Sequence, residues 1–436
     1  MKKNLLVVLI LVLLASFVLT ACGTTGESGE SGEEQVTVTF FHKWPEPEQL
    51  AYYNYVIEEY EKIHPNIKIE MEAASDEAYK DKIRILMASE EVPDIYFSWA
   101  GEFSWKFARA GQALDLTDAV LNSDWKDKIV MSAVEPFKVG DKIYGVPMRI
   151  NAKFMAYNKA MFEDYNLSVP TNWDEFLAVC ETLKSNGEVP IAFGNEFPWA
   201  SAHYVGCVHA CLSSRYYLKA DYLLTAEPDD LFTDPNYVEA LKRFQVLADK
   251  GYFNDGANGI NHSNARSSFI AGKTGMFFLE LEEFTTIAGD EGDDWFGFFQ
   301  LPGGTGGEGD ENLITGAPDG FMIYGKTEHP EEAIDFLKFV ISPEMGAEYV
   351  KQLGIPSAAV GAVTSENALP NVVEGLKQIN EASGMALWMD TDMDIRIVEV
   401  YLPGMQAVLG GTKTPEEVTQ EVHDIAVIVQ ESKLEE

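Results

Sequence analysis

Tryptophan, carboxylate and amide side chains recur in this 436-residue chain just past short apolar segments that have the composition of buried strands. An indole ring offers a flat apolar face, whereas carboxylates, amides and ammonium groups exchange hydrogen bonds. This combination favours the binding of a small molecule that has an apolar face and a polar rim. The residues in such positions are Lys43, Trp44, Glu46, Trp99, Glu102, Asn195, Glu196, Trp199, Glu280 and Glu282.

Motifs of catalysis and of metal binding are incomplete in the sequence. Residues 272–274 read like the end of a phosphate loop, but Ser267 replaces the glycine that is needed five residues earlier. The alternating aspartates of 390–394 resemble the start of a calcium loop, yet Ile395 and Tyr401 replace the required Gly and Glu. Neither Gly-x-Ser-x-Gly nor His-Glu-x-x-His occurs. We predict no cofactor and no metal, and a pair of glycosidase carboxylates stays open, because counting does not exclude one among 70 acidic residues.

His203, Cys207 and Cys211 are spaced four residues apart and would share one stripe of a helix. Such a stripe could ligate zinc, but the sequence offers no fourth ligand at a suitable spacing. Packing of small side chains in a core is the favoured interpretation, because free cysteine is at home there. With Cys180, three cysteines remain after Cys22, and an odd number does not predict a disulfide framework.

The elements that position these residues follow from the periodicity of apolar side chains. Strands alternate with helices, which favours parallel βαβ units in which ligands gather beyond the carboxyl ends of the strands. The predicted strands are 36–42, 67–71, 95–98, 189–193, 275–279 and 321–324. The predicted helices are 47–63, 77–88, 172–183, 235–250, 330–341, one led by Pro343 after Ser342, and one from Pro415, within a helical last quarter.

Pro147 lies between two apolar, strand-like pieces. Because proline donates no hydrogen bond, a central strand must shift or bend there. Arg149 and Asn151 follow the bend and could face a cleft between two folded bodies. A single strand with a bulge is the other interpretation, and the spacing alone does not decide between them.

The composition limits the class of protein. A length of 436 residues suggests two or three domains, and 46% hydrophobic residues are ample for their cores. The formal net charge of −38 repels phosphate backbones, so we expect no nucleic-acid partner.

The N-terminus has the features of a targeting segment. Lys2 and Lys3 precede the apolar run 5–18, which is shorter than the roughly 20 residues of a membrane-spanning helix and typical of a signal peptide. Leu-Thr-Ala before Cys22 resembles the lipobox of bacterial lipoproteins. We predict a signal peptide over 1–21, a lipid on Cys22, and a flexible tether over 22–35. A plain secretory signal is the alternative.

Ordered local patterns make nearly the whole mature chain resemble the extracellular solute-binding proteins, family 1, of bacterial ABC importers, relatives of maltose-binding protein. Each pattern is weak alone, and their order carries the resemblance. They are Pro93-Asp94-Ile95, Tyr144-Gly145-Val146-Pro147, Tyr157-Asn158-Lys159, Trp173-Asp174-Glu175-Phe176, Gly272-Lys273-Thr274-Gly275-Met276, residues 333–339 with Ser342-Pro343-Glu344, and Thr414-Pro415-Glu416-Glu417.

The resemblance implies an α/β fold of class II with two lobes, a hinge of several crossover segments and a ligand cleft between the lobes. It favours a hinge near 148–150, with further crossings near 317 and 355–358, and closure by hinge bending. The N-terminal lobe would comprise 36–148 and 317–356, and the C-terminal lobe 149–316 and 357–436.

The resemblance also implies the contact positions of the cleft. Many relatives carry a tryptophan after the Gly-x-x-x-Met strand, where this chain has Glu280 and Glu282, so we expect polar contacts there. Asp390, beside Trp388, is added as a neighbour. The positions carried over are Trp44, Trp99, Glu102, Arg149, Asn195, Glu196, Trp199, Asp319 and Trp388. We expect structural roles for Trp105, Trp125, Trp173 and Trp295.

The function implied is that of a monomeric lipoprotein on the outer face of the cell membrane that hands an oligosaccharide to an ABC permease. A xylo- or cello-oligosaccharide is the preferred ligand. The alternatives are a surface-anchored glycoside hydrolase, an adhesive lipoprotein, and a binding protein for a peptide or, given the acidic charge, a polyamine.

Overall fold

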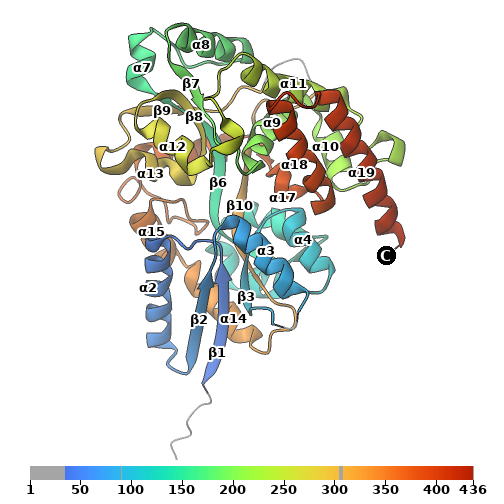
Figure 1. The fold of residues 1–436 in the computed structure, drawn as a ribbon. Coiled ribbons are helices and arrows are strands. Elements are labelled where there is room, and N and C mark those ends of the chain that lie inside the picture. Colours follow the sequence, from blue (N-terminus) through green and yellow to red (C-terminus); the bar gives the residue numbers. More distant parts are fainter. Residues whose placement is uncertain (1–34, 90, 304–307, 436) are drawn as a thin grey trace, which may run out of the picture. The chain divides into compact units, whose positions relative to one another are not determined.

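Two long antiparallel strands, β6 (Gly145–Asn158) and β10 (Leu313–Ile323), form the centre of the fold in this computed structural model (Figure 1). The structure describes residues 35–89, 91–303 and 308–435. The predicted signal peptide, Cys22 and the tether up to residue 34 lie outside the described residues. The hydrogen-bonded strand order is β2-β1-β3-β10-β6-β8-β7, with β11 beside β10 and β9 beside β6.

The first part of the chain forms the predicted βαβ units. Strands β1 (Val36–His42), β2 (Ile67–Ala73) and β3 (Ile95–Trp99) are separated by helices α2 (Pro47–Ile63) and α3 (Asp76–Met87). β1 pairs in parallel with both β2 and β3, as predicted. The carboxyl ends of these strands therefore lie at one edge of the sheet.

Strand β6 runs through Pro147 as one strand with a bulge. Its register with β10 pairs Arg149 with Asp319 and Pro147 with Gly320, so Met148 is an extra residue opposite that step. The expected disturbance at Pro147 is confirmed, and the single strand with a bulge is the form that it takes. A Cβ on Gly320 would lie 2.2 Å from the carbonyl oxygen of Val146, so the close approach of the two strands requires glycine. The prediction of 321–324 captured only the end of β10.

The second part of the chain repeats the alternation of strands and helices. It contains α8 (Trp173–Ser185), β7 (Val189–Ala192), α9 (Trp199–Leu212), α11 (Pro235–Asp249), α12 (His262–Ile270), β8 (Thr274–Glu280), the 3-10 turn η5 (Leu281–Glu283) and β9 (Phe296–Phe299). Asn172 caps α8 as predicted, by accepting a hydrogen bond from the N–H of Glu175. The reciprocal bond of a capping box is displaced, because Glu175 accepts from Thr171 instead.

The last part is helical apart from one short strand. α15 begins with Pro343 behind its cap Ser342, and a capping box between Thr414 and Glu417 starts α19, both as predicted. The three-residue strand β11 went unpredicted, because so short a segment shows no periodicity. The elements are α14 (Pro330–Val340), α15 (Pro343–Leu353), α16 (Pro370–Glu381), β11 (Gly384–Ala386), α17 (Met389–Asp392), α18 (Ile395–Leu409) and α19 (Pro415–Glu435).

Smaller elements connect these parts. They are α4 (Glu102–Arg109), α5 (Thr117–Leu121), α6 (Met131–Val134), β4 (Lys138–Val139), β5 (Lys142–Ile143), α7 (Lys159–Asp164), α10 (Arg215–Tyr222) and α13 (Phe284–Ala288).

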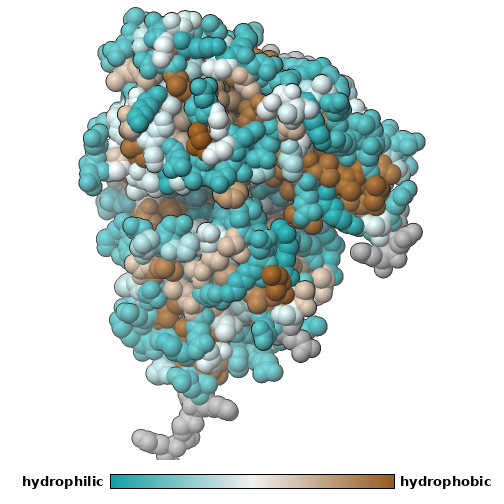
Figure 2. All heavy atoms as spheres, in the orientation of Figure 1, coloured by the Kyte–Doolittle hydropathy of each residue, from teal (hydrophilic) through white to brown (hydrophobic). Residues whose placement is uncertain are grey.

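Buried apolar side chains gather in separate cores. One core contains residues from 38–148 and 317–355, together with Trp388. The others contain residues from 152–314, 372 and 389–429. The chain passes between the cores along β6 and β10, again between Ile355 and Val372, and then on both sides of Trp388. None of the described helices combines the length and the apolar character that crossing a bilayer would require. The surface seen in Figure 2 is largely hydrophilic.

Candidate ligand-binding site

A cavity of about 410 Å³ opens where α3, β3 and β10 meet α9, α12 and η5, and we call it the central cavity. A second cavity of about 650 Å³ adjoins it, since both are lined by Lys43, Asp76 and Glu282. Eight predicted site residues line the central cavity: Lys43, Trp99, Trp199, Glu280, Glu282, Asp319, Trp388 and Asp390. Trp44, Glu46 and Arg149 line the adjoining cavity. Trp105, Trp125, Trp173 and Trp295 line neither.

Arg149 is the centre of a buried ion-pair group. Its side chain is 1% exposed and stands opposite Asp319 in the register of β6 and β10. Nε and Nη2 lie 2.8 and 2.6 Å from Oδ2 of Asp319, and Nη1 contacts Glu282. Burial alone would lower the pKa of Arg149, but the two carboxylates raise it well above its usual value. The register of the two long strands thus fixes a permanent cation between two acids at the cavity wall.

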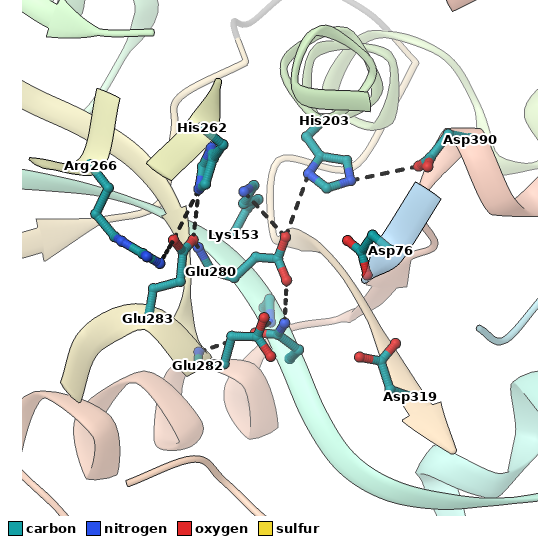
Figure 3. A network of polar contacts seen from close by, with 12 residues as sticks. Asp76, Lys153, His203, His262, Arg266, Glu280, Glu282, Glu283, Asp319 and Asp390 are labelled. Atoms are coloured by element: carbon teal, nitrogen blue, oxygen red, sulfur yellow. Dashed lines mark hydrogen bonds and ion pairs between the residues drawn. The ribbon is translucent and has the colours of Figure 1, made fainter. Parts of the chain in front are cut away.

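Glu280, at the end of β8, holds a second polar group, shown in Figure 3. Its carboxylate lies 3.3 Å from Nζ of Lys153, accepts a hydrogen bond from Asn151, and lies 3.9 Å from Nδ1 of His203. Nε2 of His203 lies 3.6 Å from Oδ1 of Asp390 on α17. Burial lowers the pKa of His203, with a smaller contribution from Lys153, so its ring is neutral near pH 7.

Glu282 has the opposite protonation behaviour to Glu280. Burial raises the pKa of Glu282 above its usual value, and the nearby charge of Glu280 adds to the rise against the opposing effect of Arg149. Burial also opposes ionisation of Glu280, but its pKa is lowered, with the largest lowering contribution from the charge of Lys153. The wall therefore offers one carboxylate acceptor and one group that can carry a proton near neutral pH.

The aromatic side chains around the cavities differ in what covers their rings. The guanidinium of Arg149 lies 4.7 Å from the centre of the Trp44 ring, and the ammonium groups of Lys43 and Lys80 lie 4.9 and 5.2 Å from that of Trp99. His203 stacks on Trp388 at 4.4 Å. The ammonium group of Lys153 lies 5.3 Å from the centre of the Trp199 ring, so groups of the protein contact the rings of all four predicted stacking residues.

The structure places three predicted residues away from both cavities. Glu102 is buried at the start of α4, where it pairs with Arg109 and lies 3.6 Å from Lys433. Asn195 is fully buried and bonds Asn258 and Ser201, which makes it part of the loop's own support. Glu196 is exposed. These three residues follow strand ends, as several residues that line the cavities do. Position in the sequence after a strand, however, does not determine where the side chain points.

Sequence reasoning missed more of the residues that line the central cavity than it found. Asp76 could have been found, because it starts α3 just past the carboxyl end of β2. The others carry no local signal, since they lie within helices or loops whose orientation only the fold sets. The missed residues include Asp76, Lys80, Phe197, His203, His262, Arg266 and Glu283. Phe197 is 44% exposed at this cavity.

The histidine–cysteine stripe belongs to the buried interior of α9. Cys207 and Cys211 are packed in the core, and Sγ of Cys207 lies 3.6 Å from the carbonyl oxygen of Leu301. His203 faces Glu280 and Asp390 instead. Within the part of the chain that the structure describes, no group of three His, Cys, Asp or Glu residues is placed to hold a metal ion.

The chain is similar to known binding proteins in sequence and in fold. The family model of bacterial extracellular solute-binding proteins matches residues 43–347. The multiple sugar-binding protein of Streptococcus mutans is 26% identical over 81% of this chain and 82% of its own length. A chitin oligosaccharide binding protein superposes with a TM-score of 0.82, at 24% identity over 91% of this chain and 99% of its own. A structure described with xylan utilization by Caldanaerobius polysaccharolyticus also gives 0.82, at 23% identity over 89% and 99%.

Proposed function

Because the chain belongs to the bacterial extracellular solute-binding proteins, we propose that it captures an oligosaccharide in the central cavity and delivers it to the membrane permease of an ABC importer. The observation that carries this proposal is a cavity in which Trp199 and Phe197 accompany a fixed set of ionised hydrogen-bonding groups. The sugar-binding name of the streptococcal relative supports it.

The energetics of sugar binding fit such a wall. Micromolar affinity corresponds to about 8 kcal/mol. Stacking contributes roughly 0.5–1.5 kcal/mol per ring pair, so the aromatic side chains alone cannot supply this binding free energy. Hydrogen bonds to charged groups, at about 1.5–3 kcal/mol each, supply the remainder. Asp319, Glu280 and Asp390 are the acceptors in question, and Lys43 and Lys80 the donors.

Three further features belong to the proposal. The protein acts as a monomer anchored by a lipid on Cys22 at the extracellular face of the cell membrane. Its lobes, 36–148 with 317–356 and 149–316 with 357–436, close on the ligand by bending at the bulge of β6. The ligand is a short xylo- or cello-oligosaccharide, a choice supported by the structural neighbours described with xylan and with chitin oligosaccharide.

The test is calorimetric titration of the protein with xylotetraose, cellotetraose and maltotetraose, alongside spermidine and a tripeptide. We expect at least one tetrasaccharide to bind with micromolar affinity. We also expect that tetrasaccharide to be recovered without hydrolysis. Release of new reducing ends would indicate a glycoside hydrolase. Tight binding of spermidine without heat from any saccharide would overturn the proposal.

A further inference from the structure

The central cavity has an excess of negative charge that its own cations do not balance. Seven carboxylate residues line it, against three lysine or arginine residues, and two further cations pair with lining carboxylates: Arg149 with Glu282 and Asp319, and Lys153 with Glu280. Each of the three lining cations already has a carboxylate partner: Lys43 lies 3.1 Å from Asp76, Lys80 lies 3.1 Å from Glu77, and Arg266 lies 3.0 Å from Glu283. An acidic ligand would therefore have to displace an existing ion pair.

Two of the lining carboxylates are nearly buried and keep one oxygen without a hydrogen-bond donor. They are Asp319 on β10, with its side chain 3% exposed, and Asp390 on α17, with its side chain 7% exposed. Oδ1 of Asp319 has no hydrogen-bond partner among the described residues, and Oδ1 of Asp390 has Nε2 of His203 at 3.6 Å, beyond ordinary hydrogen-bond distance. A buried acceptor without a donor costs about 1–3 kcal/mol, and more when it is charged. Both oxygens thus favour a ligand that brings donors.

Arg149 and Lys80 approach the other oxygens of these two carboxylates, at 2.6 Å from Oδ2 of Asp319 and 3.8 Å from Oδ2 of Asp390, and the Oδ1 atoms favour a positive charge over a neutral hydroxyl. Figure 3 shows Asp76, Asp319 and Asp390 on one side of an open space, with Glu280 and Glu282 across from them. The neutral ring of His203 beside Asp390 adds no positive charge there near pH 7. Hydrogen bonds from an ionised donor to a carboxylate are about twice as strong as those between neutral groups.

We infer that the cavity prefers an oligosaccharide that carries a protonated amino group, such as a β-1,4-linked 2-amino-2-deoxy sugar, whose ammonium group bonds Asp319 and Asp390. The inference rests on the proposed function, an oligosaccharide-binding protein, and replaces the neutral xylo- or cello-oligosaccharide proposed there with an amino-sugar oligosaccharide. Sugars with a carboxylate or sulfate are excluded by the same walls.

Three tetrasaccharides with the same β-1,4 backbone provide the test, because they differ only at carbon 2. Cellotetraose carries a hydroxyl there, the glucosamine tetramer an ammonium, and the N-acetylglucosamine tetramer a neutral amide. We expect the glucosamine tetramer to bind at least tenfold more tightly than either neutral sugar at pH 6. This preference should disappear at pH 9, where the amine is neutral, and should shrink at least threefold between 50 and 500 mM NaCl.

Single substitutions test whether the preference for the glucosamine tetramer depends on Asp319 and Asp390. Asp390→Asn and Asp319→Asn should each reduce it to less than threefold, whereas Asp249→Asn, at an exposed position outside the cavity, should retain it. Should Asp319→Asn not fold after losing its bond to Arg149, Asp390→Asn and the salt series decide. Equal or tighter binding of a neutral tetramer at pH 6 overturns the inference and leaves the proposed function intact. Absence of binding by all saccharides overturns both.

Discussion

Two pairs of aromatic side chains meet the cavities, and they differ in what covers their rings. Trp44 and Trp99, from the first part of the chain, are each 5% exposed. Phe197 is 44% exposed, and Trp199 is half-buried. The first pair belongs to the core that supports the cavity wall, whereas the second pair stays partly exposed to solvent, although Lys153 lies 5.3 Å from the centre of the Trp199 ring. An aromatic residue at the end of a strand is therefore not by itself a stacking platform.

Cations and a neighbouring ring cover the first pair. Arg149 covers Trp44, and Tyr53 stacks on the same ring at 5.8 Å with an interplanar angle of 11°. The ammonium groups of Lys43 and Lys80 lie over Trp99. Cation–π contacts of this kind contribute about 0.5–1 kcal/mol at exposed sites and about 2 or more when desolvated. These contacts help to position the cationic groups, and the cationic groups in turn form ion pairs with the carboxylates that line the cavities.

The largest effect that tests this comparison is expected for Trp44→Ala. Removing a buried tryptophan should lower the free energy of unfolding by about 3–5 kcal/mol, because the cavity left behind cannot collapse fully. Urea denaturation followed by circular dichroism measures it. Unchanged stability together with lost sugar affinity would show instead that Trp44 is a free stacking platform.

The second prediction concerns the protonation of Asp392, a buried carboxylate on α17, and is tested by Asp392→Asn. Burial raises the pKa of Asp392 to about 8, and the charge of Glu102 adds to the rise. An acid whose pKa is higher in the folded state stabilises the fold fully only below its unfolded pKa, about 3.9, and loses that stabilisation as the pH rises towards 8. The variant should therefore be about 1–3 kcal/mol more stable than the native protein at pH 8.5. The gain should be small at pH 4.5.

The matched control for this prediction is Asp249→Asn, at an exposed position. Urea midpoints of both variants at the two pH values give the comparison. An Asp392→Asn gain that did not depend on pH would show that the aspartate is not protonated in the folded state.

Trp199→Ala should affect binding more than folding. Loss of one stacked ring should cost about 0.5–1.5 kcal/mol of affinity, or roughly 2- to 12-fold, with little change in the thermal midpoint. Titration calorimetry and a thermal melt measure the two quantities. The buried Trp388, 4% exposed, is the matched comparison, and Trp388→Ala should lower the thermal midpoint as well.

Phe197→Ala should have the smallest effect. Because Phe197 is the most exposed of the four rings, its loss should change stability by less than about 0.5 kcal/mol. Sugar affinity should fall by no more than a few fold. A loss of folding stability larger than that of Trp44→Ala would reverse the comparison between the two pairs.

Local patterns in the sequence located most elements well. The bounds of α2 and β1 were predicted to the residue, and α3, β2 and β3 to within two, because each carries its own periodicity and capping signals. β10 and β11 were predicted poorly. β10 is buried along all eleven residues, and a strand covered on both faces shows no alternation.

The candidate site was only partly predictable. Arg149, Glu280 and Glu282 were identified from their positions after a bend or a strand end. His203, His262 and Arg266 lie on helices α9 and α12 that turn one face toward the cavity, and no pattern within those helices marks that face. Glu102 and Asn195 show the reverse error, since both follow strands and yet support the fold.

The sequence by itself determined the alternation of strands and helices, the acidic charge and the family, because these depend on residues close together in the chain or on composition. Only the tertiary structure decided which side chains share the cavity. Arg149 and Asp319 are 170 residues apart and meet only because β6 and β10 pair in one register with a bulge at Met148. A shift of that register by one residue would place the two side chains on opposite faces of the sheet and remove the ion pair.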